Sequence, residues 1–317
     1  MVPSLSVSCK RMADFWGHCV MIILKGVVAS AWRNARFLWT SRNAPPTYSI
    51  KAVASNGTVF VAVSNNSNVA LVSTDGISWS QYATLPSSNH WFAIVWNGTV
   101  FVTTSYATSA AAYSSDGGQT WSASTLPSVD NWEGIAANGS GVIVALANSS
   151  GQCATSSDNG HSWTSRSMPS TSSWISVAWN GTVFCAVSDS FGTVAATSPD
   201  GTTWTAQTLP SSQQWSSIGW NGTVFCAFSS GDSATSPNGV TWTSHTQTLL
   251  YTSGIAWNGS VFCVCSQNSN KAFTSPDGVT WTLRLLPSAS TWQSIAWNGS
   301  LFMIVGYGSL AVTSPMS

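Results

Sequence analysis

The chain has 317 residues, of which 6% are charged, and its ten basic and ten acidic side chains give a formal net charge of zero. A chain without net charge has no long-range field to attract nucleic acid or an anionic membrane, so we expect neither as a partner. Hydrophobic residues make up 44% of the chain and include 19 tryptophans, which is enough for a packed core and argues against disorder.

Residues 1–34 do not belong to the repeats that follow. Lys10 and Arg11 precede the apolar run CVMIILKGVVASA, whose small C-terminal residues are typical of a signal-peptide cleavage site. The run is too short to span a membrane. We predict a secretory signal or an arm that attaches the chain to virion or surface subunits; a disordered extension or a misassigned start is also compatible with this segment.

The rest of the chain, residues 35–317, repeats a unit of about 40 residues, a period typical of propellers and solenoids. Each unit contains an alternating run such as WISVAW, an Asn-Gly pair, the run TVFCAVS, a third run such as VAATS, an SPDG turn and a fourth run. Asn-Gly tolerates the positive φ that tight hairpin turns need. The pairs begin 37 to 42 residues apart, at Asn56, Asn97, Asn138, Asn180, Asn221, Asn258 and Asn298.

Four short strands repeated seven times predict an all-β fold, a seven-bladed β-propeller of four-stranded antiparallel blades. The segment around Trp39 matches the fourth run of the later units, and the last unit, residues 291–313, is followed by no fourth run. We therefore predict that residues 38–42 supply the fourth strand of the last blade and close the ring, because an open ring would leave two unpaired edges.

The turn before the fourth run carries a recurring motif. SSDNGHSW and SSDGGQTW match S-x-D-x-G-x-[TS]-W, and four other copies are one residue shorter. The motif resembles the Asp-box, or BNR repeat, of sialidase-like and photosystem-assembly-factor-like propellers and of uncharacterised phage and bacterial surface proteins. The resemblance covers residues 38–317 and implies a structural role, in which the box side chain bonds the backbone of its own turn. These side chains are Asp75, Asp116, Asp158, Asp200, Asn238 and Asp277; Met316 replaces the acid in the seventh copy.

Sialidase activity, which the resemblance raises, would need three converging arginines, a Tyr–Glu nucleophile pair and an acid/base Asp. From residue 38 onward the arginines are Arg42, Arg166 and Arg284, all at one position of the predicted outermost strand, so they should point around the rim. Asp130 and Glu133 are close enough in sequence to form a glycosidase pair, but we interpret them as solvated loop carboxylates. We predict no catalytic residues and no enzyme; a degenerate sialidase-type glycosidase is the alternative.

Metal and cofactor sites are not expected. Cys185, Cys226 and Cys263 recur directly after Val-Phe, and we interpret them as buried thiols that act as small hydrophobic residues. The sequence has no CxxC pair or Cys/His cluster, and phosphate loops and dinucleotide fingerprints are missing.

The resemblance to Asp-box propellers implies that the loops entering the first strand of each unit lie on the face opposite the boxes, where members of that family usually bind ligands. These loops bring tryptophans, or Tyr251 in the sixth unit, next to Ser, Asn and Gln, a combination suited to sugars. The alternative is that a residue recurring at one position is a spacer between blades. The predicted ligand contacts are Trp91, Trp132, Trp174, Trp215, Tyr251 and Trp292, with the non-repeating loop residues His90, Asp130, Glu133 and Asp189.

These observations favour a non-catalytic binding or structural propeller that recognises a glycan or a host or cell surface, as an extracellular protein or a phage tail or virion module. Besides the glycosidase, the alternative is a protein-assembly factor of the photosystem type, with a protein partner. A basic patch would favour that alternative, but from residue 38 onward the repeats contain only two lysines and three arginines.

Overall fold

A computed structural model describes residues 38–43, 49–246, 251–308 and 310–315. Two units are distinguished along the chain, Met1–Arg36 and Phe37–Ser317, and all described residues lie in the second. The predictions for residues 1–34 and for Met316 lie outside the described residues. Throughout the described part the regular structure is β-strand, so the all-β prediction is confirmed.

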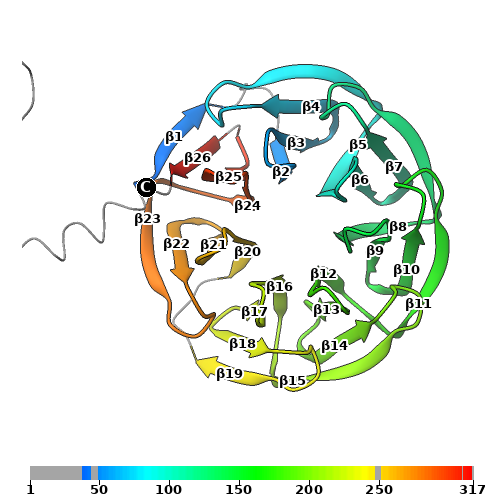
Figure 1. Cartoon of the computed structure of the whole chain (residues 1–317), viewed down its shortest axis with the longest axis vertical. Helices are drawn as coiled ribbons and strands as arrows, with labels where there is room; N and C mark the ends of the chain where they lie inside the picture. The colour runs from blue at the N-terminus through cyan, green and yellow to red at the C-terminus, as the bar shows by residue number, and fades with distance from the viewer. Residues whose placement is uncertain (1–37, 44–48, 247–250, 309, 316–317) are drawn as a thin grey trace, which may run out of the picture. The chain divides into compact units, whose positions relative to one another are not determined.

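The second unit consists of antiparallel sheets whose strands follow one another in chain order around a central opening (Figure 1). Three sheets have four consecutive strands each: β12 (Trp174–Trp179), β13 (Phe184–Ser188), β14 (Gly192–Ser198) and β15 (Thr205–Gln213); β16 (Trp215–Trp220), β17 (Phe225–Ser229), β18 (Asp232–Ser236) and β19 (Thr243–Thr246); and β20 (Thr252–Trp257), β21 (Phe262–Ser266), β22 (Ser269–Ser275) and β23 (Thr282–Ser290).

A ten-stranded sheet precedes them, from β2 to β11. Its length comes from two long strands, each of which is the outer strand of one group of four and the inner strand of the next. Residues 80–89 of β5 pair with β4 and residues 90–96 with β6, and β8 behaves in the same way. The strands are β2 (Ser49–Ser55), β3 (Phe60–Asn65), β4 (Ser67–Ser73), β5 (Ser80–Trp96), β6 (Phe101–Tyr106), β7 (Thr108–Ser114), β8 (Ser122–Ala137), β9 (Ile143–Asn148), β10 (Ser150–Ser156) and β11 (Thr164–Ser172).

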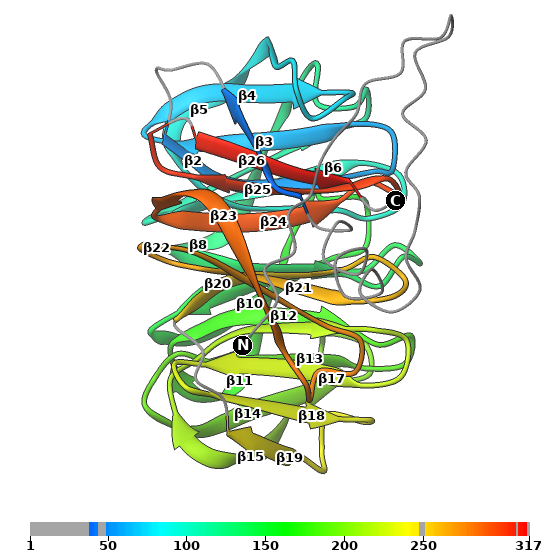
Figure 2. The same ribbon diagram turned by 90° about the vertical axis from the view of Figure 1, so that its left-hand side faces the viewer.

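The remaining four-stranded sheet joins distant parts of the sequence. Strand β1 (Thr40–Asn43) pairs antiparallel with β26 (Leu310–Pro315), with Thr40 opposite Thr313. Strand β26 pairs in turn with β25 (Leu301–Gly306), and β25 with β24 (Trp292–Trp297). Trp39, directly before β1, is buried in a cluster with Leu286 and Val312. In Figure 2 the sheets are seen from the side, following one another along the rim.

The Asn-Gly turns form between the first two strands of each group, but not through the predicted Asn conformation. In the first group Gly57 has φ 90°, whereas none of the turn asparagines has a positive φ. Instead the Asn56 side chain accepts hydrogen bonds from the backbone nitrogens of Thr58 and Val59, both at 2.9 Å. Asparagine is therefore used as a side-chain acceptor, and only the glycine takes the left-handed conformation.

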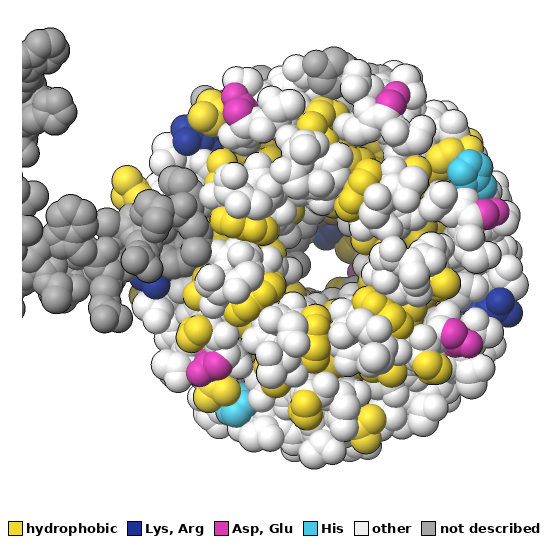
Figure 3. All heavy atoms as spheres, viewed as in Figure 1, with side chains coloured by type: hydrophobic (Ala, Val, Ile, Leu, Met, Phe, Trp, Pro, Cys, Tyr) yellow, Lys and Arg dark blue, Asp and Glu magenta, His cyan; other side chains and the backbone are white. Residues whose placement is uncertain are grey.

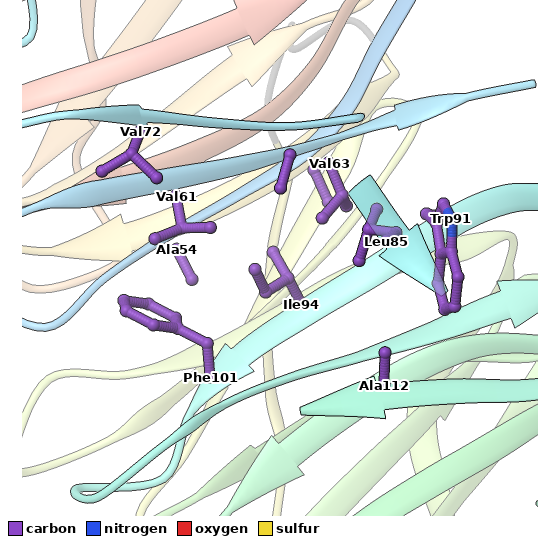
Figure 4. Close-up of a cluster of buried hydrophobic side chains, with 11 residues drawn as sticks. Ala54, Val61, Val63, Val72, Leu85, Trp91, Ile94, Phe101 and Ala112 are labelled. Carbon is purple, nitrogen blue, oxygen red and sulfur yellow. The ribbon is translucent and has the colours of Figure 1, made fainter. Parts of the chain in front are cut away.

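Apolar clusters fill the spaces between neighbouring sheets. Figure 4 shows one of them, in which Trp91, Ile94 and Phe101 of one group face Val61 and Val63 of the preceding group. The alternation of the strands dictates this arrangement, because side chains two apart point to the same face of a sheet. The repeated cysteines Cys185, Cys226 and Cys263 are fully buried within such clusters, as predicted.

The box turns connect the third and fourth strands. Asp75 Oδ1 accepts hydrogen bonds from the backbone nitrogens of Ile77 (2.7 Å) and Ser78 (2.8 Å). Asn238 makes the same pair of bonds, so an amide can replace the acid there. On the face viewed in Figure 3, most of the visible acidic side chains lie singly near the outer rim, around a hollow centre.

Candidate functional site

The central channel is lined by one strand from each group of four. These inner strands are β2, β5, β8, β12, β16, β20 and β24, and they enclose a cavity of about 280 Å³. That volume lies just below the range of about 300–1,000 Å³ that is typical of small-molecule pockets. The cavity therefore has room for a small molecule or for a side chain presented by a partner.

All seven inner strands carry a β-bulge at the same position. In β12, for example, Trp174 lies opposite Ser188 and Ser176 opposite Val187, so Ile175 has no partner in the ladder. A bulge adds one unpaired residue and re-aims its side chain, and such bulges occur frequently beside active sites. We call the seven unpaired residues the bulge ring: Lys51, Phe92, Glu133, Ile175, Ser216, Ser253 and Gln293. All seven line the cavity.

The bulge ring is chemically varied, whereas the ring two residues further along the same strands is uniform. That second ring contains only β-branched aliphatic side chains: Val53, Ile94, Ile135, Val177, Ile218, Ile255 and Ile295. The bulge ring includes a cation, an anion, an aromatic ring, an aliphatic side chain, an amide and two hydroxyls. The cavity thus combines an apolar wall with a ring of distinct polar groups, an arrangement typical of ligand sites.

Lys51 is the cation of the ring. Its Nζ donates a hydrogen bond to Gln293 Oε1 at 2.6 Å and lies 3.9 Å from the centroid of the Phe92 ring, which is cation–π geometry. Burial lowers the pKa of Lys51 to about 8, although the negative charge of Glu133 acts to raise it.

Glu133 is the anion of the ring. Burial raises the pKa of this carboxyl, against the effects of a hydrogen bond from Asn148 and the charge of Lys51. Asn148 Nδ2 donates to Glu133 Oε1 at 2.9 Å. Lys51 and Glu133 influence each other electrostatically, yet each is hydrogen-bonded to a neutral amide instead. Both charges therefore stay available to the cavity.

Tyr251 adds a phenol beside the ring. It lines the cavity, and its hydroxyl donates to Asp189 Oδ2 at 3.2 Å. Burial and then the charge of Asp189 raise the pKa of Tyr251 above its usual range, so the phenol remains protonated. Asp189 is not among the cavity-lining residues; its carboxyl, whose pKa is raised by burial, orients Tyr251 from behind.

A stack of aromatic side chains begins at Phe92 of the bulge ring. The rings of Phe92 and Tyr106 are stacked with centroids 5.8 Å apart, and Tyr106 stacks on His90 at 6.1 Å. His90 is exposed and does not line the cavity. His90, which we predicted as a ligand contact, therefore forms the outer end of this stack and does not face the cavity.

The predicted tryptophan contacts need correction. Trp91, Trp132, Trp174, Trp215 and Trp292 have no exposed surface. Their indole nitrogens are satisfied by backbone carbonyls, as in the 3.0 Å bond from Trp174 Nε1 to Ser170 O. A buried indole offers no face to a sugar, so these five residues are spacers in the core rather than ligand contacts.

The two carboxylates that the sequence suggested as a pair have different locations. Glu133 lines the cavity, but Asp130 lies opposite Thr108 in the ladder between β7 and β8, and its Oδ1 accepts a hydrogen bond from the Asn131 backbone nitrogen at 2.8 Å. We therefore correct the interpretation of Glu133 as a solvated loop carboxylate, because burial separates it from solvent.

The three repeat arginines do not converge. Arg42, Arg166 and Arg284 lie on β1, β11 and β23, and each Nε donates to a threonine hydroxyl of the adjacent strand, at 2.9, 3.2 and 3.0 Å respectively. They brace outer strands, as their shared position predicted, and none lines the cavity.

Sequence reasoning missed most of the bulge ring. Of its seven residues only Glu133 was a candidate. The signal was present nevertheless: five residues before the turn asparagines, the seven units carry six different kinds of side chain, while the positions around it repeat. An unpaired bulge residue makes no ladder contacts, so strand pairing does not fix its identity and the groups that it meets in the cavity can do so.

No helix long and apolar enough to cross a membrane occurs in the described ranges. The same ranges contain no cluster of three or more His, Cys, Asp or Glu side chains arranged to hold a metal ion.

Comparisons with known proteins identify the class of protein. Residues 33–175 match the model of the DUF6242 beta propeller domain family. No curated protein matches the sequence significantly. Among solved structures, YCF48 bound to D1 peptide superposes with a TM-score of 0.71 at 18% identity, covering 88% of this chain and 97% of that one.

Two further solved structures have similar folds. Virginiamycin B lyase from Staphylococcus aureus gives a TM-score of 0.78 at 11% identity, with 87% of this chain and 98% of the lyase covered. YCF48 from Cyanidioschyzon merolae gives 0.67 at 15% identity, covering 87% and 98%. At these identities the likeness establishes the β-propeller fold alone, since one propeller fold carries unrelated functions.

Proposed function

We propose that this chain is a non-catalytic binding propeller that takes a polypeptide partner at the mouth of its central channel. The observation that carries the proposal is the bulge ring: seven inner strands turn their one unpaired residue toward the same cavity, and these residues differ in chemistry. Different side chains at one repeat position suit the recognition of a partner. If the position served packing alone, we would expect the same residue in every unit.

A seven-bladed ring closed by residues 38–42 is part of the proposal. Two features support it: the pairing of β1 with β26, and the contact of β24 with β2, which brings the last inner strand beside the first. The ten-stranded sheet then corresponds to three blades that share β5 and β8. Closure would protect the sheet edges from pairing with other chains.

The kind of partner follows from the size and chemistry of the cavity. A volume of about 280 Å³ admits one side chain presented by a polypeptide, while a glycan chain would need exposed stacking surfaces around the mouth. The five predicted tryptophan platforms are buried. A protein partner is also what a photosystem-type assembly factor has, and YCF48, a neighbour in fold, is described in complex with a peptide.

The test compares a peptide array with a glycan array, probed with the full chain and with two charge insertions. Ile175→Glu places a carboxylate in the bulge ring, and Ile77→Glu places one at a box turn, where the isoleucine is 51% exposed. We expect the wild type and Ile77→Glu to bind the same peptides, and Ile175→Glu to lose at least about tenfold in affinity.

Two outcomes would overturn the proposal. Glycan binding without peptide binding would favour the glycan prediction, and equal peptide affinities of the two variants would move the site away from the channel. The absence of enzymatic activity and an extracellular or virion location stay predictions; a glycosidase screen of the same samples tests the first.

A further inference from the structure

We propose that Lys51 is a site of reversible covalent capture for small aldehydes, which enter the channel and form an imine with its amine. This inference is independent of the polypeptide partner. It rests on the placement of the amine: Lys51 is the one lysine among the residues that line the cavity, and the wall beneath it is the uniform Val/Ile ring.

The walls of the cavity fit a small apolar carbonyl compound. Phe92 from β5 and Ile94 and Ile135 from the second ring supply apolar surface. The volume of about 280 Å³ accommodates a molecule such as one aromatic ring with short substituents. The carbonyl carbon of such a ligand would lie beside the Lys51 amine.

The reaction needs no co-reactant beyond the aldehyde. The neutral amine of Lys51 adds to the carbonyl carbon, the carbonyl π electrons move to oxygen, and both amine protons pass to that oxygen, which leaves as water. The imine nitrogen can then take up a proton from solvent. Amine and aldehyde thus give imine and water, and no electron is gained or lost. The protonated imine keeps one N–H and a positive charge, so the Gln293 Oε1 acceptor and the Phe92 ring can stabilise it as they stabilise the ammonium.

The reactivity of the amine follows from its surroundings. Since burial lowers the pKa of Lys51 to about 8, roughly a tenth of the amine is neutral at pH 7, against about one part in 3,000 for an ordinary lysine. Lysines that lose their proton readily in such pockets are the ones that form Schiff bases. Glu133 on β8 is the charged group that acts on Lys51; Phe92 on β5 and Gln293 on β24 are neutral.

Lys271 provides an internal control, because it is the other lysine of the described residues and lies on β22, away from the cavity. The full chain is incubated with benzaldehyde at each pH, the imines present after a fixed short time are reduced in one step with excess borohydride, and modified lysines are located by peptide mass mapping. We expect Lys51 to be modified at least about tenfold faster than Lys271 at pH 7, with a rate that rises between pH 7 and 9. Lys51→Gln, which borrows the residue of another unit at the same position, should abolish the fast modification.

A second variant tests the site when the first affects folding. Glu133→Gln removes the charge that raises the pKa of Lys51, so the midpoint of the pH–rate profile should move to lower pH, while Asp130→Asn should leave it unchanged. Equal modification rates of Lys51 and Lys271, or a Lys51 rate that is flat from pH 7 to 9, would overturn the proposal. Loss of peptide binding by Ile175→Glu is measured separately, so the two proposals can fail independently.

Discussion

The box turns and the channel mouth hold the same kind of side chain in opposite environments. At a box, Asp158 is exposed, and although burial acts to raise its pKa, hydrogen bonds from Ser162 and Ser156 lower it to about 2. In the cavity, burial raises the pKa of Glu133. A carboxylate whose acceptors are filled by its own turn is structural; one that is desolvated beside a cavity remains available to a ligand.

The largest expected effect tests the buried indoles that separate the blades. Trp174→Ala should lower the free energy of unfolding by about 3–5 kcal/mol, because it leaves a cavity in the core and the Ser170 carbonyl without its donor. Urea unfolding measures the change. The matched control is Phe191→Ala, whose side chain is 75% exposed and whose removal should cost less than about 0.5 kcal/mol. A cost below about 1 kcal/mol for Trp174→Ala would return these indoles to the ligand candidates.

At the boxes the expected effect is intermediate. Asp200→Ala should cost about 1–2 kcal/mol, since the backbone nitrogens of Thr202 and Thr203 lose their acceptor. The stability of Asp200→Asn should stay close to that of the wild type at pH 7, because Asn238 accepts the equivalent backbone hydrogen bond in its own box. The hydrogen bond from the Thr202 backbone lowers the pKa of Asp200 in the folded state. The stabilising contribution of Asp200 is therefore present above its unfolded-state pKa and is lost as the pH falls through its folded-state pKa. Unfolding at pH 7 and pH 3 checks both statements; peptide binding should not change.

Glu133 should show the opposite pH dependence. Because burial raises its pKa above the ordinary 4.5, its stabilising contribution is complete below about pH 4.5 and is lost as the pH rises through the folded pKa. The stability of Glu133→Gln relative to wild type should therefore increase from pH 4 to pH 7. A constant difference measured by urea unfolding at both pH values would mean that Glu133 is as solvated as the sequence suggested.

The smallest effect is expected within the bulge ring. Ile175→Gln copies the residue of another unit, and Ile175 is only partly buried and has no ladder partner. The free energy of unfolding should change by less than about 1 kcal/mol, while affinity for peptides changes. If Ile175→Gln lost more stability than Asp200→Ala, the distinction between structural box turns and a ligand-binding bulge ring would be contradicted.

Much of the fold was predictable because it is written locally and repeatedly. The box turns, the strand alternation and the buried cysteines each depend on neighbours within one unit, and Trp39 could be matched to the fourth strand by sequence alone. The indoles were harder. A tryptophan at the position of Trp174 would recur in the sequence whether it packed between blades or bound a ligand. Only the finding that Trp174 has no exposed surface distinguishes packing from binding.

The sequence by itself determined an all-β repeat of four short strands with structural Asp and Asn at its turns, because hydrogen bonds within a turn and alternation along a strand are short-range. Only the tertiary structure decided which carboxylate meets solvent and which meets the channel. Lys51 and Glu133, 82 positions apart in the sequence, act on each other because two bulged inner strands turn toward one axis. Burial and electrostatic proximity of this kind depend on several inner strands together, so no single unit of the sequence specifies them.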